Sequence, residues 1–448
     1  MKISIKNLGP IKNAEFEISD FTAITGFNNT GKTYISYALY GFLKTWSTNT
    51  KNLELDEEIN SFIENGSLTI KLSKFKKKVL GNFSQLTKNY SENIHNIFSA
   101  NEEEYKQTEF NIRLNQNDIL LKNTINSDIS IKGKKILSVN KDQESEDLNF
   151  KINLESNTKL PPKYILSEIV SEYINEALLN EILPTPYIIT SERTGINIFQ
   201  NELDINKNVF FEKLAQSKTG KFDLNPFEYI DEVFNRYSIP IKDGIDRTRD
   251  IEKDFKQNSY ISKEYPAIVK KLENSTGVGY KNNKGQYFIT YKEGRKKIAL
   301  PVYLGSSSSR ALFDLYLFIK HTAKKGQLLI IDEPELNLHP KIQIQIARLL
   351  ASLSNIGVKV MITSHSDYIV KEINNLIMLS SDFENKASFK KSHKYLEYEF
   401  LKNINFYITE NSTLSHIETD KFGLLRTTFD DSIREMQNIS DELYENLL

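Results

Sequence analysis

The chain has 448 residues, 39% of them hydrophobic and 26% charged, which is typical of a soluble globular protein of two or three domains. Lysine plus arginine (58) nearly balance aspartate plus glutamate (59), so bulk charge does not favour nucleic-acid binding, and contact with DNA would need a local patch. Cysteine is absent, which excludes disulfides, thiolate metal sites and cysteine nucleophiles. No apolar run approaches the ~18 residues of a membrane span, so we expect a cytoplasmic protein without a membrane partner.

Three short strands and a helix frame a glycine-rich stretch at the start of the chain. Residues 2–7 and 13–18 alternate polar and apolar side chains, and FTAIT (21–25) is a third strand. GFNNTGKT (26–33) follows at once, and an apolar helical spacing then lasts to about Trp46. The stretch matches the phosphate-loop pattern G-x-x-x-x-G-K-[ST], in the strand–loop–helix context that this pattern requires.

The glycine-rich stretch predicts a cradle for the phosphates of a nucleoside triphosphate. The Lys32 ammonium would neutralise β- and γ-phosphate oxygens, the backbone amides of 28–32 would cradle the β-phosphate, and the Thr33 hydroxyl would bind Mg²⁺. Taken alone, a chance polar turn remains the alternative. The residues expected to contact the nucleotide are Gly26, Asn28, Asn29, Thr30, Gly31, Lys32 and Thr33.

Residues 47–186 look like an insertion, rich in Asn, Lys, Ser and Glu. A helical stretch is expected near 57–100, and short alternating runs such as FNIRL, DISIK and LNFKINL follow it. PPKYILSEIVSEYINEALLNEI (161–182) then reads as an amphipathic helix opened by proline. The basic run KLSKFKKKVL (71–80) either touches a phosphate backbone or is a solvated helix face.

The middle of the chain leads to a run of four serines. An apolar YII precedes TSERTGI (190–196), a mostly helical region runs to about Leu272, and VGYKNNKGQYFITY reads as a hairpin turning on NNKG. In YLGSSSSRALFDLYLFI (303–319), serine caps a helix, and its N-terminus is also suited to an anion. One face of that helix is expected to carry Leu312, Leu315, Tyr316 and Ile319.

Two buried strands near the C-terminus end in polar residues. In GQLLIIDEPELNLHP (326–340), an apolar strand is followed by Asp332, which is suited to holding Mg²⁺, and by Glu333, which is suited to polarising an attacking water. In VKVMITSHSDYI (358–369), a second strand is followed by His365, which is placed to bond a γ-phosphate and the attacking water. The sequence therefore predicts Thr33 and Asp332 as metal ligands and Glu333 and His365 as catalytic residues.

The tail is expected to hold two strands and a helix. LEYEFL (396–401) and INFYIT (404–409) read as strands, and the last 20 residues as a closing helix. The helix carries an apolar stripe that either packs on the protein's own core or docks a partner. The stripe consists of Ile433, Met436, Ile439, Leu443 and Leu447.

These motifs in this order resemble the ATP-binding-cassette (ABC) class of P-loop ATPases. More narrowly, SERTGI, GSSSSR, IDEPELNLHP and TSHSDYIVKEIN are similar to the AAA_15/AAA_21 group, which includes the ATPase halves of overcoming-lysogenisation-defect nucleases and the ATPase subunits of Septu-type anti-phage systems. The resemblance implies an α/β fold, an ABC-type head with a mixed sheet plus helices and an inserted, mainly helical or mixed subdomain. The head would comprise 1–46 and 300–448 with the segment 187–196, the insertion 47–186, and a helical lobe with the hairpin 197–299.

The resemblance also implies a head-to-head homodimer, or a higher even oligomer, with ATP and Mg²⁺ bound between subunits. The signature serines of one chain, Ser307, Ser308 and Ser309, would face the γ-phosphate held by the other chain. The family pattern has a glycine after the serine, so the four-serine run leaves open which hydroxyl makes this contact. His339 matches the family's D-loop, and a standard Q-loop glutamine is not identified. Ser191, Glu192 and Arg193 are expected to form a loop that faces the site.

The functional hypothesis is a slow ATPase that acts as sensor or assembly subunit of a bacterial anti-phage system, with a separate nuclease or effector protein as partner. Nucleases of the resembling group append a metal-binding domain after the switch histidine, and the segment after His365 is too short for it. Alternatives from other classes are a RecF-like DNA repair or recombination ATPase, which would bind DNA, a stand-alone regulatory ATPase and a transport cassette.

Overall fold

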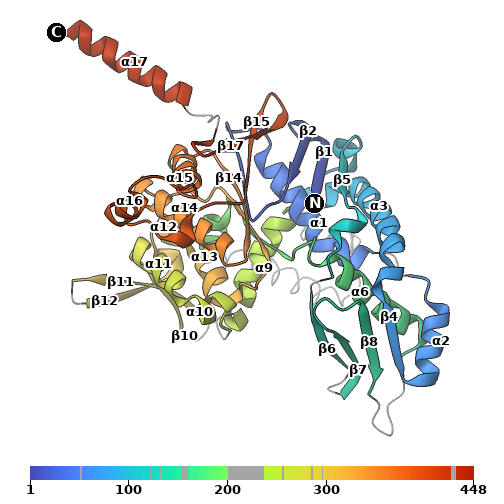
Figure 1. Ribbon diagram of the computed structural model, residues 1–448. Helices are drawn as coiled ribbons and strands as arrows, with labels where there is room; N and C mark the ends of the chain where they lie inside the picture. Colours follow the sequence, from blue (N-terminus) through green and yellow to red (C-terminus); the bar gives the residue numbers. More distant parts are fainter. Residues whose placement is uncertain are drawn as a thin grey trace, which may run out of the picture.

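The computed structural model describes residues 1–50, 53–121, 123–131, 134–153, 160–199, 237–254, 257–283, 286–294, 296–424 and 430–447. Its centre is a nine-stranded mixed sheet with helices on both faces (Figure 1), so the predicted α/β class is confirmed. In sheet order the strands are β5 (Glu109–Arg113), β1 (Lys2–Leu8), β2 (Ile11–Glu17), β16 (Thr413–Ile417), β15 (Ile404–Glu410), β3 (Phe21–Gly26), β14 (Lys359–Ser364), β13 (Leu328–Asp332) and β9 (Pro186–Ile189).

Five neighbouring strands, from β15 to β9, run parallel, and their side chains divide the core in two. Successive residues of a strand point to opposite faces, and β13 is buried on both. Leu328 and Ile330 pack into one cluster with α1 (Lys32–Asn49), whereas Leu329 and Ile331 pack into the other. The first cluster also includes α3 (Lys76–Glu92) and α6 (Lys163–Leu179), and the second includes α13 (Phe313–Leu317), α14 (Pro340–Asn355) and α15 (Asp367–Met378).

The segment 47–186 contains an antiparallel sheet, and the helical stretch expected near 57–100 is interrupted by a strand between α2 (Asp56–Asn65) and α3. Gly66 adopts a left-handed conformation (φ 69°) that ends the first helix, and Leu68 and Ile70 then alternate with polar residues in a strand. The period of two in this short run was missed. The sheet has the order β4 (Ser67–Lys71), β8 (Asp147–Ile152), β7 (Lys134–Lys141) and β6 (Ile125–Ile131), and α2 packs against β4. Helix α4 (His95–Phe98) packs against α1 instead, next to α5 (Glu102–Tyr105).

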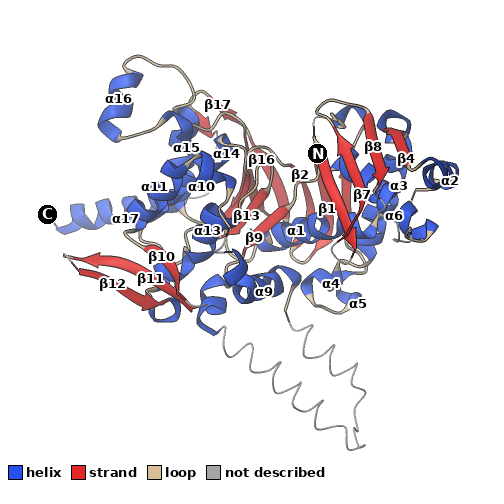
Figure 2. Cartoon of the chain, turned by 90° about the horizontal axis from the view of Figure 1, so that it is seen from below, coloured by secondary structure: helices blue, strands red, loops and turns tan. Residues whose placement is uncertain are grey.

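The same segment also completes the central sheet. Strand β5 pairs antiparallel with β1, and the Tyr90 hydroxyl of α3 donates to the Ala38 carbonyl of α1 at 2.6 Å. The segment 47–186 is therefore packed into the first core cluster rather than tethered beside it. Figure 2 shows its four-stranded sheet at one end of the molecule and a three-stranded sheet at the other.

The three-stranded sheet contains the predicted hairpin, which is confirmed. Strand β10 (Gly279–Asn283) pairs with β11 (Gln286–Glu293), and β12 (Lys296–Pro301) adds a third strand. Helices α9 (Ile239–Asp254), α10 (Tyr260–Glu264) and α11 (Pro266–Thr276) precede it, while the part of the predicted helical region at 200–236 lies outside the described residues. The serine run opens α12 (Ser307–Ala311), and α13 and a π-helical turn (Phe318–Thr322) continue it in place of one regular helix.

One of the three elements predicted in the tail is wrong, and the structure adds elements that were not predicted. LEYEFL forms a 3₁₀ turn (Glu397–Glu399) instead of a strand, because Glu399 is buried in an ion pair with Lys271 and its carboxylate also accepts from the Leu396 backbone N–H at 2.9 Å. The INFYIT strand is confirmed as β15. The remaining elements are α16 (Lys386–His393), β17 (Thr419–Asp420), β18 (Gly423–Leu424) and α17 (Asp430–Leu447).

The closing helix α17 points away from the body of the protein (Figure 1). Met436, Ile439 and Leu443 are 69%, 52% and 59% exposed, so this part of the apolar stripe does not pack on the protein's own core. The side chains of Ile433 and Leu447 lie outside the described part of the chain.

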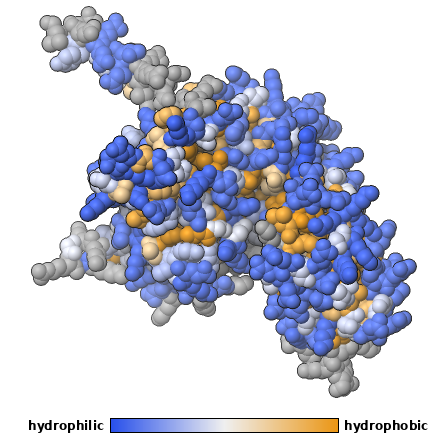
Figure 3. Space-filling model, in the orientation of Figure 1, coloured by the Kyte–Doolittle hydropathy of each residue, from blue (hydrophilic) through white to orange (hydrophobic). Residues whose placement is uncertain are grey.

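The face of the molecule drawn in Figure 3 is mostly hydrophilic at its rims, and hydrophobic side chains show through near its middle. In the part of the chain that the structure describes, no helix is both long and apolar enough to cross a membrane.

Candidate functional site

Three neighbouring parallel strands bring the predicted site residues to one edge of the sheet. Strand β14 lies between β3 and β13, and all three point the same way. The glycine-rich loop follows β3, Asp332 ends β13, and His365 follows β14. Ligands of open α/β sheets bind outside the carboxyl ends of the strands. The fold therefore places the glycine-rich loop, the acidic pair Asp332–Glu333 and the histidine at the edge of the sheet where ligands of such folds bind.

The glycines of the loop cannot be replaced without a clash. Gly26 and Gly31 have φ of 144° and 95°, a region that disfavours any residue with a Cβ. A Cβ on Gly26 would lie 2.2 Å from Thr409 Oγ1, and one on Gly31 would lie 2.6 Å from Ile11 Cγ1. The loop backbone thus packs against β15 and the start of β2, which fixes its shape.

The start of α1 and the Lys32 side chain supply the positive end of the site. The first N–H groups of a helix have no partner within the helix and attract anions, and α1 is long enough to present them with their dipole. Lys32 Nζ donates to the carbonyls of Gly26 at 2.9 Å and Phe27 at 2.7 Å. Burial lowers the pKa of Lys32, and the nearby Glu333 and Asp332 oppose this shift. These groups fit a phosphate anion.

Asp332 is held by two threonines. Thr33 Oγ1 donates to its Oδ2 at 2.9 Å and to its Oδ1 at 3.2 Å, and the Thr363 hydroxyl donates to Oδ1 from β14. Burial raises the pKa of Asp332 to about 6, and both hydroxyls oppose the shift. Carboxylate and hydroxyl oxygens are the ligands that Mg²⁺ prefers, so Thr33 and Asp332 fit this ion.

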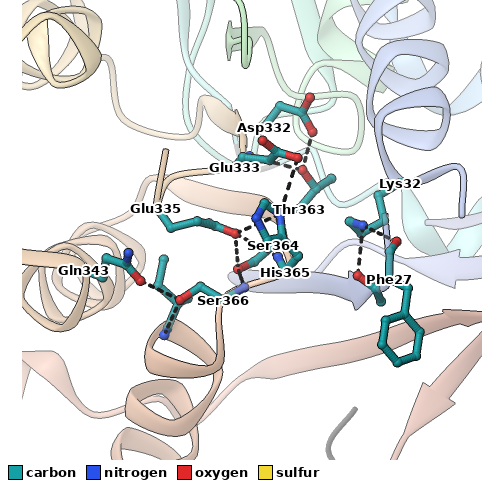
Figure 4. A network of polar contacts seen from close by, with 12 residues as sticks. Phe27, Lys32, Asp332, Glu333, Glu335, Gln343, Thr363, Ser364, His365 and Ser366 are labelled. Carbon is teal, nitrogen blue, oxygen red and sulfur yellow. Dashed lines mark hydrogen bonds and ion pairs between the residues drawn. The ribbon is translucent and has the colours of Figure 1, made fainter. Parts of the chain in front are cut away.

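Glu333 and His365 face each other beside this centre (Figure 4). His365 Nδ1 lies 3.4 Å from Glu333 Oε1 and 3.5 Å from Glu335 Oε1. The contact with Glu333 raises the pKa of His365, and the same contact lowers the pKa of Glu333. Glu333 is therefore a carboxylate at neutral pH, the form that accepts a proton. Its φ of 52° is rare for a residue other than glycine and concentrates at functional sites.

Glu335, which the sequence analysis did not single out, holds the loop that carries His365. Its buried Oε1 accepts from Ser364 Oγ at 2.9 Å and from the His365 backbone N–H at 2.7 Å. The next residue of this loop, Ser366, donates to Gln343 Oε1 at 2.6 Å, and Gln343 Nε2 donates to the Leu338 carbonyl at 2.8 Å. The histidine loop is thus tied to the segment between β13 and α14.

The serine run lies apart from the glycine-rich loop of the same chain. Ser306 caps α12, its Oγ accepting from the Ser309 backbone N–H at 3.2 Å. Ser306 and Ser307 are exposed, and Ser309 is buried. Residues 26–33 and 306–310 are all described, and no hydrogen bond or ion pair found among them joins the two segments. The predicted contact with a phosphate across a dimer stays a prediction.

The SER segment adjoins the acidic pair. Tyr37 of α1 donates to Glu192 Oε2 at 3.0 Å, and the buried Arg193 donates to the backbone carbonyls of Asp332 and Glu333. Ser191 lies in the turn before them. His339, the predicted D-loop residue, is exposed and caps α14 by accepting from the Lys341 backbone N–H at 3.2 Å.

Sequence comparison places the whole site within one known family. Residues 1–370 match the family described as AAA ATPase domain (AAA_15). This chain belongs to the AAA ATPase domain family. The predicted fold class, an α/β P-loop ATPase head, is confirmed by this membership together with the sheet described above. No curated protein matches this AAA ATPase in sequence.

Solved structures similar to this AAA ATPase include heads of Smc proteins. The Smc head domain bound to the C-terminal domain of ScpA, derived from Pyrococcus furiosus, is 12% identical, with 98% of each chain covered and a TM-score of 0.34. The SMC head domain from Thermotoga maritima is 11% identical, with 94% of this chain and 98% of that chain covered and a TM-score of 0.31. An SmcHead bound to the C-winged helix domain of ScpA is 13% identical, with 97% and 98% covered and a TM-score of 0.35.

The Lys32→Ala variant of this AAA ATPase is expected to bind ATP roughly 10- to 100-fold more weakly, because charge-assisted bonds to the phosphates are lost. Direct titration by calorimetry measures the affinity. Lys44→Ala is the matched control, because Lys44 lies on the same helix and pairs with Asp243 away from the loop. Equal affinity of the Lys32 variant and the parent would favour the polar-turn interpretation.

The Asp332→Asn variant is compared with the parent in buffer with EDTA. The unfolding free energy of the variant minus that of the parent is expected to increase as the pH rises from about 4 to about 6. Folding raises the pKa of Asp332 from 3.8 to about 6, so the unfolded chain releases this proton first and the parent loses stability across that window. The Asn side chain does not ionise, so the variant does not lose this stability, which amounts to up to about 3 kcal/mol in the parent. Urea unfolding at several pH values measures the difference, and a flat difference would contradict it.

Proposed function

We propose that this AAA ATPase binds ATP with Mg²⁺ and hydrolyses it slowly to ADP and phosphate. The observation that carries the proposal is the convergence of Lys32, Thr33, Asp332, Glu333 and His365 at the ends of three adjacent parallel strands. The free N–H groups of α1 and the Lys32 ammonium bind and orient the phosphates. When bound by Thr33 and Asp332, Mg²⁺ would supply positive charge beside the phosphate oxygens.

In this proposal Glu333 is the general base. Its low pKa keeps it ionised, and its carboxylate points into the site beside His365. The imidazole, at 3.4 Å, orients the carboxylate and is placed to donate a hydrogen bond to the γ-phosphate. Glu335 accepts a hydrogen bond from the His365 backbone N–H and fixes the backbone there, so the Glu333 carboxylate and the His365 imidazole keep a constant distance and orientation.

The dimer proposal rests on the exposed serine run, whose resemblance to the ABC signature motif implies a contact with a second copy. Ser306 and Ser307 are open to solvent, as such a contact requires. ATP bound to the loop of one chain would meet Ser307, Ser308 or Ser309 of the other, so the complete site would form only in the homodimer or a higher even oligomer.

We further propose that ATP-driven assembly serves a bacterial anti-phage defence system in which a separate nuclease or effector protein is the partner. The support is the similarity of the segments SERTGI, GSSSSR, IDEPELNLHP and TSHSDYIVKEIN to the ATPases of such systems. Helix α17, with its exposed apolar side chains, and the segment 47–186 are the proposed docking regions for that partner.

The proposed hydrolysis is tested by incubating the pure protein with ATP and Mg²⁺ and measuring ADP release. The partner proposal is tested by challenging bacteria with phage when they carry this gene with its neighbouring gene, or with a Lys32→Ala version. Salt-dependent, tight binding of DNA by the isolated chain would instead favour the repair ATPase alternative.

Exchange of Glu333 for Gln is expected to leave ATP binding intact while turnover falls by roughly 100-fold or more, because the shape is kept and the base is lost. ATP should then hold the dimer closed, which size-exclusion chromatography with light scattering detects. Parent-like turnover would remove Glu333 from the mechanism, and loss of ATP binding would make it a structural residue.

The purified chain alone is expected to cut no DNA, since the proposal assigns cleavage to a second polypeptide. Incubation with Mg²⁺ or Mn²⁺, ATP and several forms of DNA, followed by gel electrophoresis, checks this. Metal-dependent cleavage that persists through further purification and is lost in a site variant would contradict the two-protein proposal.

A further inference from the structure

Arg193 is buried at the centre of the head and forms no ion pair within hydrogen-bond distance among the described residues. It lies at the start of a helical segment (193–199), separated from β9 by residues 190–192. Burial lowers the pKa of Arg193, and the negative charges of Asp314 and Asp332 oppose this shift most strongly. Burying a guanidinium costs roughly several kcal/mol of desolvation free energy. Well-packed apolar residues can often replace such a buried charge without lowering the stability of the folded protein. Its contacts indicate what the charge provides.

The guanidinium donates to four backbone carbonyls from three segments. Nε donates to Ala311 at 3.0 Å, Nη1 to Thr190 at 2.9 Å and to Asp332 at 2.8 Å, and Nη2 to Glu333 at 2.6 Å. The planar guanidinium offers its donors in a fixed fork, so these four carbonyls are held in a fixed mutual arrangement. Lysine, with one rotating ammonium, cannot hold all of them.

Two of these carbonyls lie on either side of the Glu333 Cα. The Asp332 carbonyl belongs to the peptide plane before Glu333, and the Glu333 carbonyl belongs to the plane after it. Because φ and ψ are the only soft rotations between these planes, fixing both carbonyls fixes the backbone of Glu333. That backbone is in the left-handed region, with φ of 52°, at a cost of about 1–3 kcal/mol. The two bonds from Arg193 oppose its relaxation.

A third carbonyl connects this backbone to the serine run. Ala311 is the last residue of α12, the helix that Ser306 caps and that carries Ser307, Ser308 and Ser309. Asn197, one turn after Arg193, donates to the neighbouring carbonyl of Arg310 at 3.3 Å. One side chain therefore contacts both the helix that bears the serines and the backbone that aims the Glu333 carboxylate.

We propose that Arg193 is a positioning residue, whose guanidinium fixes the backbone of Glu333 and couples it to α12. The inference rests on the proposed ATP hydrolysis and deepens it. A shift of α12, when its serines meet a phosphate, moves the Ala311 carbonyl and is transmitted through the rigid fork to Glu333. Glu333 is then aimed for chemistry only when the serine helix is in place.

Kinetics of Arg193→Lys and Arg193→Met test the proposal in the full-length protein. Lys keeps the charge but not the fork, and Met keeps the approximate volume without charge. We expect kcat for ATP to fall roughly 10- to 100-fold in both, with KM and the ATP dissociation constant within about twofold of the parent. A purely structural role would lower the melting temperature but leave kcat of the folded protein unchanged.

Arg247→Lys is the matched control. Arg247 also donates to a backbone carbonyl, that of Ile188 on β9, and stacks 4.5 Å from the Tyr187 ring, without a bond to the acidic pair. It is expected to lose stability without a comparable loss of kcat. Thermal unfolding establishes that each protein is folded at the assay temperature.

The outcomes separate this proposal from the proposed function. If the parent does not hydrolyse ATP, the proposed function fails and the role of Arg193 fails with it. If the parent hydrolyses ATP and folded Arg193→Lys has the parent's kcat, only the role of Arg193 is overturned. Failure of both Arg193 variants to fold, or an equal loss of kcat in Arg247→Lys, would also overturn it in favour of a structural role.

Discussion

The hydrogen bonds from Thr33 to Asp332 join residues 299 positions apart in the chain, and the arrangement of the site depends on them. They form only if β3 and β13 lie in one sheet with a single strand between them. That strand is β14, whose Thr363 bonds the same carboxylate and whose end carries His365. The two core clusters keep these strands in place from opposite faces, so packing far from the site sets the distances within it.

Much of the site could be predicted because its motifs are local. The glycine-rich loop, the acid strand and the histidine strand each show a continuous pattern of apolar residues followed by a polar end, and a strand is recognisable from such a run. Because the carboxyl ends of parallel strands lie at one edge of a sheet, Lys32, Asp332 and His365 could be predicted to share one site. The order of the strands, with β14 in the middle, was not predicted, since pairing depends on the whole sheet.

What the sequence did not reveal are bonds from side chains to distant backbone. Glu335 and Arg193 bind carbonyl or amide groups, which every residue possesses, so no residue type marks the acceptor. The TSH and SER motifs pointed to the right segments without indicating these contacts. Two secondary-structure predictions were wrong for other reasons. The LEYEFL segment forms a turn because Glu399 pairs with the distant Lys271, and β4 was missed because it is a short run between two helices.

One of the two edges of the central sheet, strand β5, belongs to the segment 47–186, which in sequence looks most like an insertion. Strand β5 covers β1 along five residue pairs, Lys2 to Lys6, and shields its hydrogen-bonding groups from solvent. An exposed edge strand is a template for pairing with other chains, and proteins normally protect it. Deleting residues 47–186 to obtain a minimal head would uncover β1 and favour aggregation. A shortened version must therefore keep β5 together with α3, which packs against it.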